Sequence, residues 1–408
     1  LGAGLAPALA AAFLRAEGYT AAPSQPGDGP HRAWVTARTP AGESVAIEIG
    51  DEGSATAFRH LAQGACDIGM ASRPPHPDEV RALVAAGAGD VTRPANEHIL
   101  ALDGIAVIVH PNRDARSLEL GALRRLFSGE VARWEGVGAG SGPVVVYSRD
   151  DASGTFDTFR HLVLGDAPLA PGAVRIASSD ELADAVAKDE AAVGFAGLTH
   201  VRSARAVAIA DGTLRPTFPT PFTVATEAYP LTRRLYLYTP DRPATLVTQS
   251  FVRFALSHEG QLVVRQAGFV DLEIKERAPE RCEGACPARY ARLASRARRL
   301  SLDFRFRAGS SELDSRAVRD VQRVVAYLAA RPAPRLVLVG FTDRVGDRAA
   351  NLQLSRERAK HVADELAAHG VAPVAIEAFG DEMPVAAGGG EDARGRNRRV
   401  ELWLEVDP

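Results

Sequence analysis

The sequence predicts an α/β protein built from two different modules. Up to about residue 274, short apolar runs alternate with helical stretches, as in "IAVIVHP" followed by "LELGALRRLF", which is typical of a mostly parallel, doubly wound sheet. From Arg299 a smaller cycle begins, with four apolar runs and two long helical stretches in the order βαβαββ. The two cycles share no repeat, so we interpret the chain as a fusion of different modules.

Between the modules, residues 275–298 lose the apolar runs and gain charge. We expect this segment to be a linker with a short helix. The predicted domains are therefore 1–274, 275–298 and 299–408. A chain of 408 residues fits two or three domains better than one.

Composition limits the function classes. The formal net charge is −3, which gives no general attraction to nucleic acid. The longest apolar runs fall short of the roughly 18 residues of a membrane-spanning helix. The first residues, "LGAGLAPALAAAFLRAEGY", have no basic leader and are typical of an amphipathic helix, so we expect no signal peptide in this chain.

The chain has three cysteines. Cys66 lies among apolar neighbours and is expected to be a buried thiol. Cys282 and Cys286 are too few for a zinc site without a second ligand pair. A short disulfide loop is the favoured alternative, and it indicates an oxidising compartment.

A loop predicted between a strand and a helix is the first candidate site. In "YSRDDASGTFDTF", Ser153, Gly154 and Thr155 fall at the start of the helix, where free backbone N–H groups favour an anion. Arg149 adds a charged planar donor. The alternative, equally favoured by this stretch alone, is that Ser153 is only the N-cap of the helix.

Two further loops have the same chemistry. Ser54 follows the apolar run "SVAIEIG", and Ser72 follows "CDIGMA". Loops that follow parallel strands meet at the carboxyl edge of the sheet, where open α/β sheets bind ligands. Three such loops therefore predict an oxyanion site.

At these positions the first module resembles the PstS-like phosphate-binding proteins, the periplasmic receptors of phosphate ABC transporters. The resemblance covers nearly all of residues 1–274 and rests on motifs in the family's order, among them "GSATAF", "DIGMASRP", "SRDDASGTFDTF", "AAVGFAGL", "YPLTRRLYLY" and "EGQLVVRQAGFVDL". It implies a two-lobed, type II-like periplasmic-binding-protein fold that holds the anion between its lobes.

The same resemblance implies the ligand set. One lobe would contribute Ser54 and Ser72, and the other Arg149 with residues 153–155, while Asp151 would hold Arg149 in position. The family also has an earlier Gly-Ser/Thr loop, and because the sequence begins at "LGAGLAP", we expect that set of donors to be missing from it. Ser72 stands where some relatives carry an aspartate that accepts the proton of hydrogen phosphate, so the resemblance implies a tetrahedral oxyanion and leaves phosphate and sulfate open.

In the second module, Asp343 follows a predicted strand and Arg358 lies on the next predicted helix. From their spacing alone, a functionally silent surface salt bridge is the favoured interpretation. The wider pattern, "GFTDRVGDRAANLQLSRERAKHV" with "AFGDEMPVA" and "GRNRRVEL", resembles the OmpA-like peptidoglycan-binding domain over residues 300–406.

This second resemblance implies a binding site for diaminopimelate of the cell-wall peptide. Asp343 would bind the ammonium group and Arg358 the carboxylate, with Asn351 in the same motif and Arg398 in a supporting role. The roles are chemically consistent, because a zwitterion needs one partner of each sign and arginine binds carboxylates bidentately.

Together these features predict an envelope or periplasmic solute-binding protein that binds phosphate or a similar oxyanion and is anchored non-covalently to peptidoglycan. An ABC transporter membrane complex is an implied partner. The alternative is a sensory or structural wall protein whose receptor-like domain binds another ligand or none. A phosphoryl-transfer enzyme is disfavoured, and no cofactor or metal is expected, because the chain has no "GxxxxGK[ST]" loop and its ten histidines are scattered.

Overall fold

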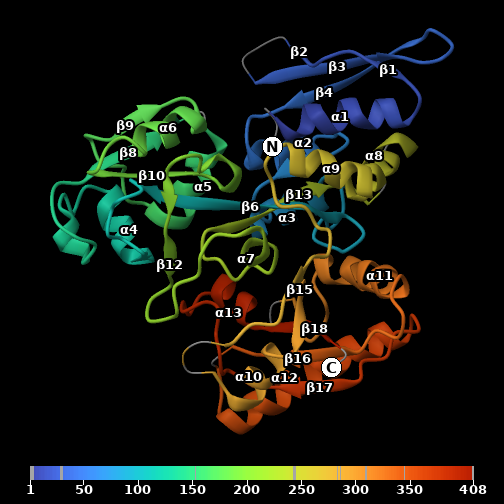
Figure 1. The fold of residues 1–408 in the computed structure, drawn as a ribbon. Helices are drawn as coiled ribbons and strands as arrows, with labels where there is room; N and C mark the ends of the chain where they lie inside the picture. The colour runs from blue at the N-terminus through green and yellow to red at the C-terminus, as the bar shows by residue number, and fades with distance from the viewer. Residues whose placement is uncertain are drawn as a thin grey trace. The chain divides into compact units, whose positions relative to one another are not determined.

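A computed structural model describes residues 4–27, 31–151, 153–241, 245–282, 284, 286–307, 310–343 and 345–406. The chain divides into two compact units, whose elements are labelled in Figure 1. Unit 1 is Leu1–Gly104, Gly197–His200 and Arg233–Glu273. Unit 2 is Ile105–Ala196, Val201–Thr232 and Ile274–Pro408. In the described part of the chain, no helix has the length and apolar character that crossing a membrane requires.

Unit 1 contains a small antiparallel sheet. Its central strand β3 (Arg32–Arg38) pairs with β1 (Thr20–Ala21), β2 (Gln25–Pro26) and β4 (Ser44–Gly50). The sequence predicted a mostly parallel sheet here. β4 differs because residues 39–43 form a tight turn, with Gly42 at φ +87°, and a parallel connection needs a much longer crossover.

The core of unit 1 is formed by helices around a second group of strands. Helix α1 (Leu5–Ala16) packs against α8 (Leu246–Leu256) and α9 (His258–Gln266). Beneath them, β5 (Gly69–Ala71) runs antiparallel to β13 (Thr232–Tyr238). Helices α2 (Ser54–Ala62) and α3 (Pro77–Ala85) flank β5 in sequence. Apolar residues of α1, α8, α9 and β13 form one buried cluster, which includes Leu5, Leu9, Leu235 and Val252.

The first part of unit 2 is an α/β layer of the predicted kind. Strand β8 (Val145–Arg149) runs parallel to β10 (Ala192–Gly197) and to β9 (Val174–Ile176). Long β6 (Glu97–Val109) pairs with β11 (Arg205–Ala206), and β7 (Ser117–Glu119) pairs with β12 (Ala208–Ala210). The helical segments are α4 (Leu120–Phe127), α5 (Gly154–Phe159), α6 (Ser179–Val186), α7 (Pro221–Ala225), the π-helix η2 (Arg160–Leu164) and the 3-10 turn η1 (Trp134–Val137). The 3-10 turn η3 (Leu198–His200) belongs to unit 1.

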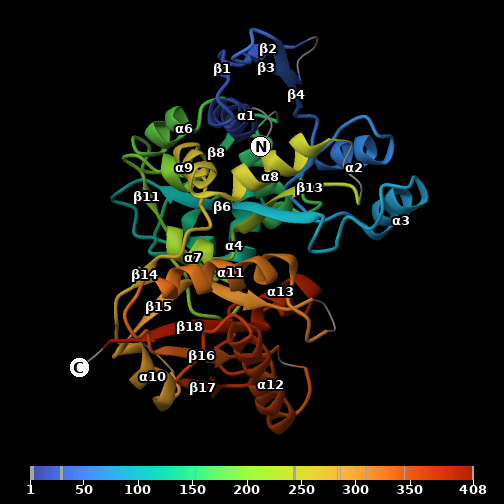
Figure 2. The same cartoon turned by 90° about the vertical axis from the view of Figure 1, so that its right-hand side faces the viewer.

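The C-terminal part of unit 2 is a five-stranded sheet with helices on both faces (Figure 2). The strand order is β14 (Glu276–Arg277), β15 (Ala297–Arg305), β18 (Arg399–Glu405), β16 (Leu336–Gly340) and β17 (Ala375–Ala378). Leu336 and Leu338 pack with residues of α11 (Ser315–Ala329) and α12 (Arg348–Ala367). Val337 and Val339 pack with α10 (Ala288–Ala294), because alternate strand residues face opposite sides.

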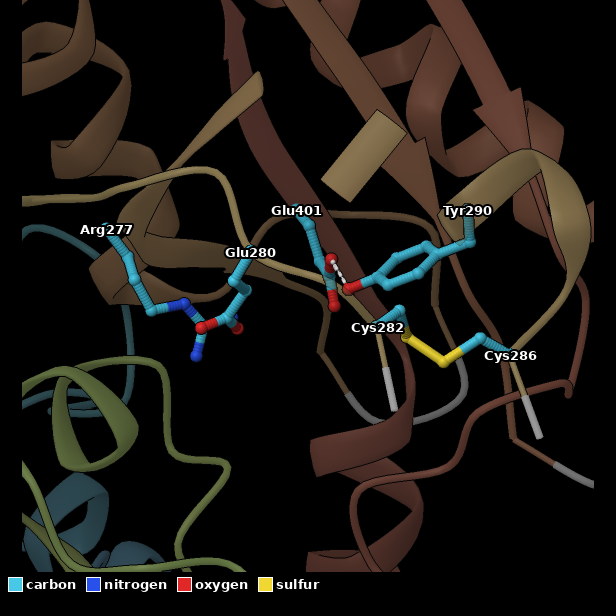
Figure 3. The surroundings of a disulfide bond; sticks show 6 residues. All are labelled: Arg277, Glu280, Cys282, Cys286, Tyr290 and Glu401. Atoms are coloured by element: carbon cyan, nitrogen blue, oxygen red, sulfur yellow. Dashed lines mark hydrogen bonds and ion pairs between the residues drawn. A yellow bond between two sulfur atoms is a disulfide. The ribbon is translucent and has the colours of Figure 1, made fainter. Parts of the chain in front are cut away.

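Two elements of the segment between the modules, β14 and α10, lie on this C-terminal sheet. β14 pairs with β15, and α10 is the short helix expected in this segment. Cys282 and Cys286 form a disulfide with a Cα–Cα distance of 6.3 Å (Figure 3). Beside it, the Tyr290 hydroxyl donates to Glu401 at 2.9 Å. The predicted boundaries at 274/275 and 298/299 stay predictions.

Candidate functional site

Unit 1 brings two of the predicted donors together. Ser54 is the first residue of α2, and Ser72 follows β5. The Ser54 Oγ accepts a hydrogen bond from the Ser72 backbone N–H at 3.0 Å, and the two Oγ atoms lie 3.4 Å apart. Gly53, at φ +98°, allows the sharp entry into α2 that a side chain would oppose. Both hydroxyls thus lie at one place on unit 1.

In unit 2, the loop after β8 has the predicted strand–loop–helix form. Ser153 is the N-cap of α5, and its buried Oγ accepts from the Phe156 N–H at 3.4 Å. Gly154 is exposed and Thr155 is half-buried. The capping role of Ser153 is therefore present, and the predicted residues 153–155 lie at the start of α5.

Arg149 is the last residue of β8, at the point where this loop begins. Its Nη1 donates to the hydroxyl of Ser179, the first residue of α6. Its Nε is buried and has no hydrogen-bond partner among the described residues. A charged donor held by one neutral partner retains capacity for an anionic ligand.

Asp151 was expected to hold Arg149 in position, and among the described residues it makes no direct hydrogen bond or ion pair with Arg149. Asp151 Oδ1 instead accepts from Arg175 Nη2 at 2.7 Å. The reason is the strand register: β9 lies parallel to β8 with Arg175 opposite Ser148, and this places a second guanidinium beside the loop. Asp151 therefore supports the loop through Arg175.

Arg175 is a residue that the sequence analysis missed. It donates to the Arg149 carbonyl at 2.5 Å, and its guanidinium carbon lies 4.5 Å from the centre of the Phe156 ring, within cation–π range. Its position depends on the pairing of β8 with β9, which no local motif indicates. Arg175 thus ties the strand end to the first turn of α5.

The described residues contain no group of three or more His, Cys, Asp or Glu side chains that could hold a metal ion. Cys66, the free cysteine, is partly buried. Burial and the neighbouring Asp67 raise the pKa of its thiol to about 11. The Cys66 thiol is therefore protonated at neutral pH and is a poor nucleophile. The loops at Ser54, Ser72 and Arg149 offer hydrogen-bond donors and a guanidinium group.

The second candidate site lies in the C-terminal part of unit 2. Asp343 follows β16, and its Oδ2 accepts from Arg398 Nη1 at 3.0 Å. Arg358 on α12 donates from Nη1 to the Thr342 hydroxyl at 2.6 Å. Within the described residues, no ion pair of 4 Å or less joins Arg358 to Asp343. The simple salt bridge suggested by the spacing is not formed.

All three charged side chains are largely buried. Burial, together with repulsion from Arg398, lowers the pKa of Arg358 to about 10, while Asp343 opposes this shift. Arg358 is thus still charged at neutral pH. Arg398 also forms an ion pair with Glu391, so the two guanidinium groups face two carboxylates. Arg358, whose hydrogen-bond partner is the neutral Thr342, is the group suited to a ligand carboxylate.

Asn351 is also buried and lies on α12. It precedes Arg358 by seven positions, about two helical turns, so both residues lie on the same face of α12. The structure therefore brings the three predicted residues of this module, Asp343, Asn351 and Arg358, onto two adjoining elements, and it adds Arg398 as a direct partner of Asp343.

Comparison with known proteins gives two family matches. Residues 32–259 match the PBP superfamily domain, and residues 305–398 match the OmpA family. The chain is 27% identical over 243 residues to the phosphate-binding protein PstS of Staphylococcus saprophyticus, which covers 57% of this chain and 74% of that protein. It is 37% identical over 110 residues to outer membrane porin F of Pseudomonas fluorescens, covering 26% of this chain and 34% of that protein.

Among solved structures, an ABC-type phosphate transport receptor from Vibrio cholerae is similar to this chain, with 24% identity and a TM-score of 0.46, covering 53% of this chain and 85% of the receptor. The PBP match spans more than half of the 408 residues. The chain therefore belongs to the PBP superfamily and carries a C-terminal domain of the OmpA family.

Proposed function

We propose that this chain is an envelope solute-binding protein, not an enzyme, that binds phosphate or a similar tetrahedral oxyanion and is anchored non-covalently to peptidoglycan. The proposed binding of phosphate is supported by the similarity of this chain to a protein named as a phosphate-binding protein. Its location would be the periplasm, and its relatives suggest an ABC transporter membrane complex as a partner.

The observation that carries anion binding is the state of Arg149. Its guanidinium has a buried Nε without a hydrogen-bond partner in the described chain and a single neutral partner at Nη1. We propose that Arg149 supplies the charge, that Ser153, Gly154 and Thr155 supply the first-turn donors of α5, and that Ser54 and Ser72 supply the donors of unit 1. A charge-assisted hydrogen bond is about twice as strong as a neutral one, so Arg149 should dominate.

Anchoring is supported by the OmpA match and by the arrangement of charges at Asp343. We propose that Asp343 binds the ammonium group and Arg358 the carboxylate of diaminopimelate. Arg398 holds the Asp343 carboxylate before the ligand arrives, and Asn351 lies on the same helix face as Arg358. Each ligand charge would then meet a side chain of opposite sign, as desolvation requires.

Isothermal titration calorimetry of the full chain with phosphate, and separately with sulfate, tests the receptor function. Saturable heat with either anion, lost in Arg149→Ala, supports it and tells which anion is preferred. No heat with either anion contradicts it and favours a sensory or structural wall protein. Co-sedimentation with sacculi that contain diaminopimelate tests the anchor independently.

A further inference from the structure

Within unit 2, a short turn of the receptor part contacts the OmpA-family domain. Residues 225–228 begin at the last residue of α7 and lie inside the PBP match, whereas Arg305, Arg316 and Arg396 lie inside the OmpA match. All of these residues belong to unit 2. Helix α7 contacts β15, and Arg396 lies on α13 (Glu391–Asn397). We call the three arginines the arginine clamp.

The clamp satisfies nearly every acceptor of this turn. Arg316 donates to the Glu227 carboxylate at 2.7 Å and to the Ala225 carbonyl at 2.9 Å. Arg305 donates to the Thr226 carbonyl at 2.7 Å, and its Nε lies 3.5 Å from Glu227. The contacts are therefore charged hydrogen bonds to one carboxylate and several carbonyls, a strong class of interaction.

Arg396 completes the clamp from α13. It donates to the Glu227 carbonyl at 3.0 Å and to the Ala228 carbonyl at 3.3 Å. Two residues further on, Arg398 is the partner of Asp343. The same short segment thus contacts both the receptor turn and the candidate peptidoglycan site.

Glu227 has an unusual backbone and environment. Its φ is +55°, a left-handed conformation that non-glycine residues seldom adopt. Thr226 and Glu227 are buried, at 1% and 8% exposure, and so are Arg305 and Arg316, at 4% each. A buried carboxylate in a strained turn is stable only with compensating charges, and here the OmpA-family domain supplies those charges.

A second contact joins the same two parts of the chain. The Asp211 carboxylate accepts from the Ala387 N–H at 2.9 Å. A Cβ built on the neighbouring Gly212 lies 3.2 Å from the Ala387 Cβ. Arg277 and Arg299 also lie over the ring of Phe222 in α7, at 4.5 and 5.8 Å from its centre. The junction is thus built from several independent contacts.

We infer that the turn at residues 225–228 is a docking site for the protein's own OmpA-family domain, and that the arginine clamp holds this receptor segment and the wall-binding domain together as one body in solution. The inference goes beyond the proposed function, since a wall anchor and a receptor need only a flexible linker. It implies that the receptor segment has a fixed orientation relative to the peptidoglycan site.

Disulfide trapping tests the docked arrangement directly. Gly212→Cys with Ala387→Cys is made in the full chain with Cys66→Ser, because the two Cβ atoms approach the distance that a disulfide needs, about 3.5–4.5 Å. We expect oxidation of the folded protein to give the 212–387 link as the main product in peptide mapping. Each single-cysteine variant and the urea-unfolded double variant are the controls. A folded yield no higher than the unfolded yield overturns the inference.

Hydrogen exchange measures the contribution of the clamp. We expect Arg316→Met and Glu227→Gln each to raise exchange of the amides in residues 222–231 by at least about tenfold, because each removes the charged hydrogen bond between these two buried side chains. Arg335→Met, which removes the exposed ion pair with Glu405, is the matched control and should change nothing there. Glu227→Gln keeps the side-chain volume, so it reports the loss of charge alone. A change of less than about twofold in both variants contradicts the clamp, whatever the outcome of the phosphate and sacculi experiments.

Discussion

Arg398 donates to Asp343 across 3.0 Å, and both side chains are buried. The carboxylate that is proposed to bind the ligand ammonium is thus already compensated by a guanidinium. Arg358, the proposed partner of the ligand carboxylate, is held by Thr342. A zwitterionic ligand can therefore enter with little change in the net charge of the site, which keeps the desolvation cost low.

This arrangement predicts that both charges are needed for wall binding. Asp343→Asn leaves the ligand ammonium without a counter-charge, and Arg358→Ala leaves its carboxylate without one. Each variant of the full chain should lose most of its co-sedimentation with diaminopimelate-containing sacculi, and the double variant should be little worse than either single one. The circular dichroism spectrum should be unchanged. Parent-like sedimentation of both single variants would mean that these charges are only structural.

The receptor loops predict a ranking of two substitutions. Arg149→Ala should weaken phosphate binding by about 1.5–3 kcal/mol, the range for a charged hydrogen bond, whereas Ser54→Ala should cost about 1 kcal/mol. Calorimetry of both variants with phosphate gives the two values. Equal affinity of Arg149→Ala and the parent protein would remove Arg149 from the site.

The Asp151–Arg175 pair predicts a second ranking. Arg175 also contacts the Arg149 carbonyl and the Phe156 ring, whereas Asp151 is exposed. Arg175→Met should therefore weaken phosphate binding more than Asp151→Asn, whose exposed pair contributes about 0–1 kcal/mol. Arg202→Met, which removes exposed pairs with Asp180 and Asp184, is the control and should bind as the parent does. If Asp151→Asn weakened phosphate binding more than Arg175→Met, the result would favour the expected role of Asp151 in holding Arg149 in position.

The cysteines predict a thiol count and a pH dependence. Titration of the unfolded, unreduced chain should find one thiol, that of Cys66, because Cys282 and Cys286 are bridged. In the folded chain, burial raises the pKa of Cys66 from 9.0 to about 11. The native state thus holds this proton more tightly than the unfolded state, and deprotonation favours unfolding.

The free energy of unfolding, relative to Cys66→Ser, should consequently be constant below about pH 9 and fall as the pH rises toward 11. Urea titrations of both proteins at a series of pH values measure this difference. A difference that does not change between pH 8 and 11 would show that the thiol is not shielded from water. Three thiols in the unfolded chain would remove the bridge.

The sequence predicted the parts of the fold that depend on nearby residues. The strand–loop–helix at Arg149 and Ser153 follows from an apolar run, small residues and helical spacing within one short stretch, and the structure has it. The alternation of Leu336, Val337, Leu338 and Val339 likewise indicates a strand that is covered on both faces.

What the sequence missed depends on contacts between distant residues. Arg175 reaches the Arg149 loop only because β9 pairs with β8 in one register, and that register decided the partner of Asp151. Glu227 gains its charged partners, Arg305 and Arg316, from residues about 80 or more positions later in the chain. Strands β3 and β4 are antiparallel because a tight turn joins them. The alternation of strands and helices in the sequence had predicted a parallel sheet.

The central claim is that one chain both binds phosphate and attaches it to the cell wall, and co-sedimentation of labelled phosphate with sacculi tests it most directly. With the parent chain, phosphate should sediment with the sacculi in proportion to bound protein. With Arg149→Ala the protein should sediment without phosphate, and with Asp343→Asn both should stay in the supernatant. If phosphate stays in the supernatant while the parent chain sediments, or if the parent chain does not sediment at all, the account is contradicted.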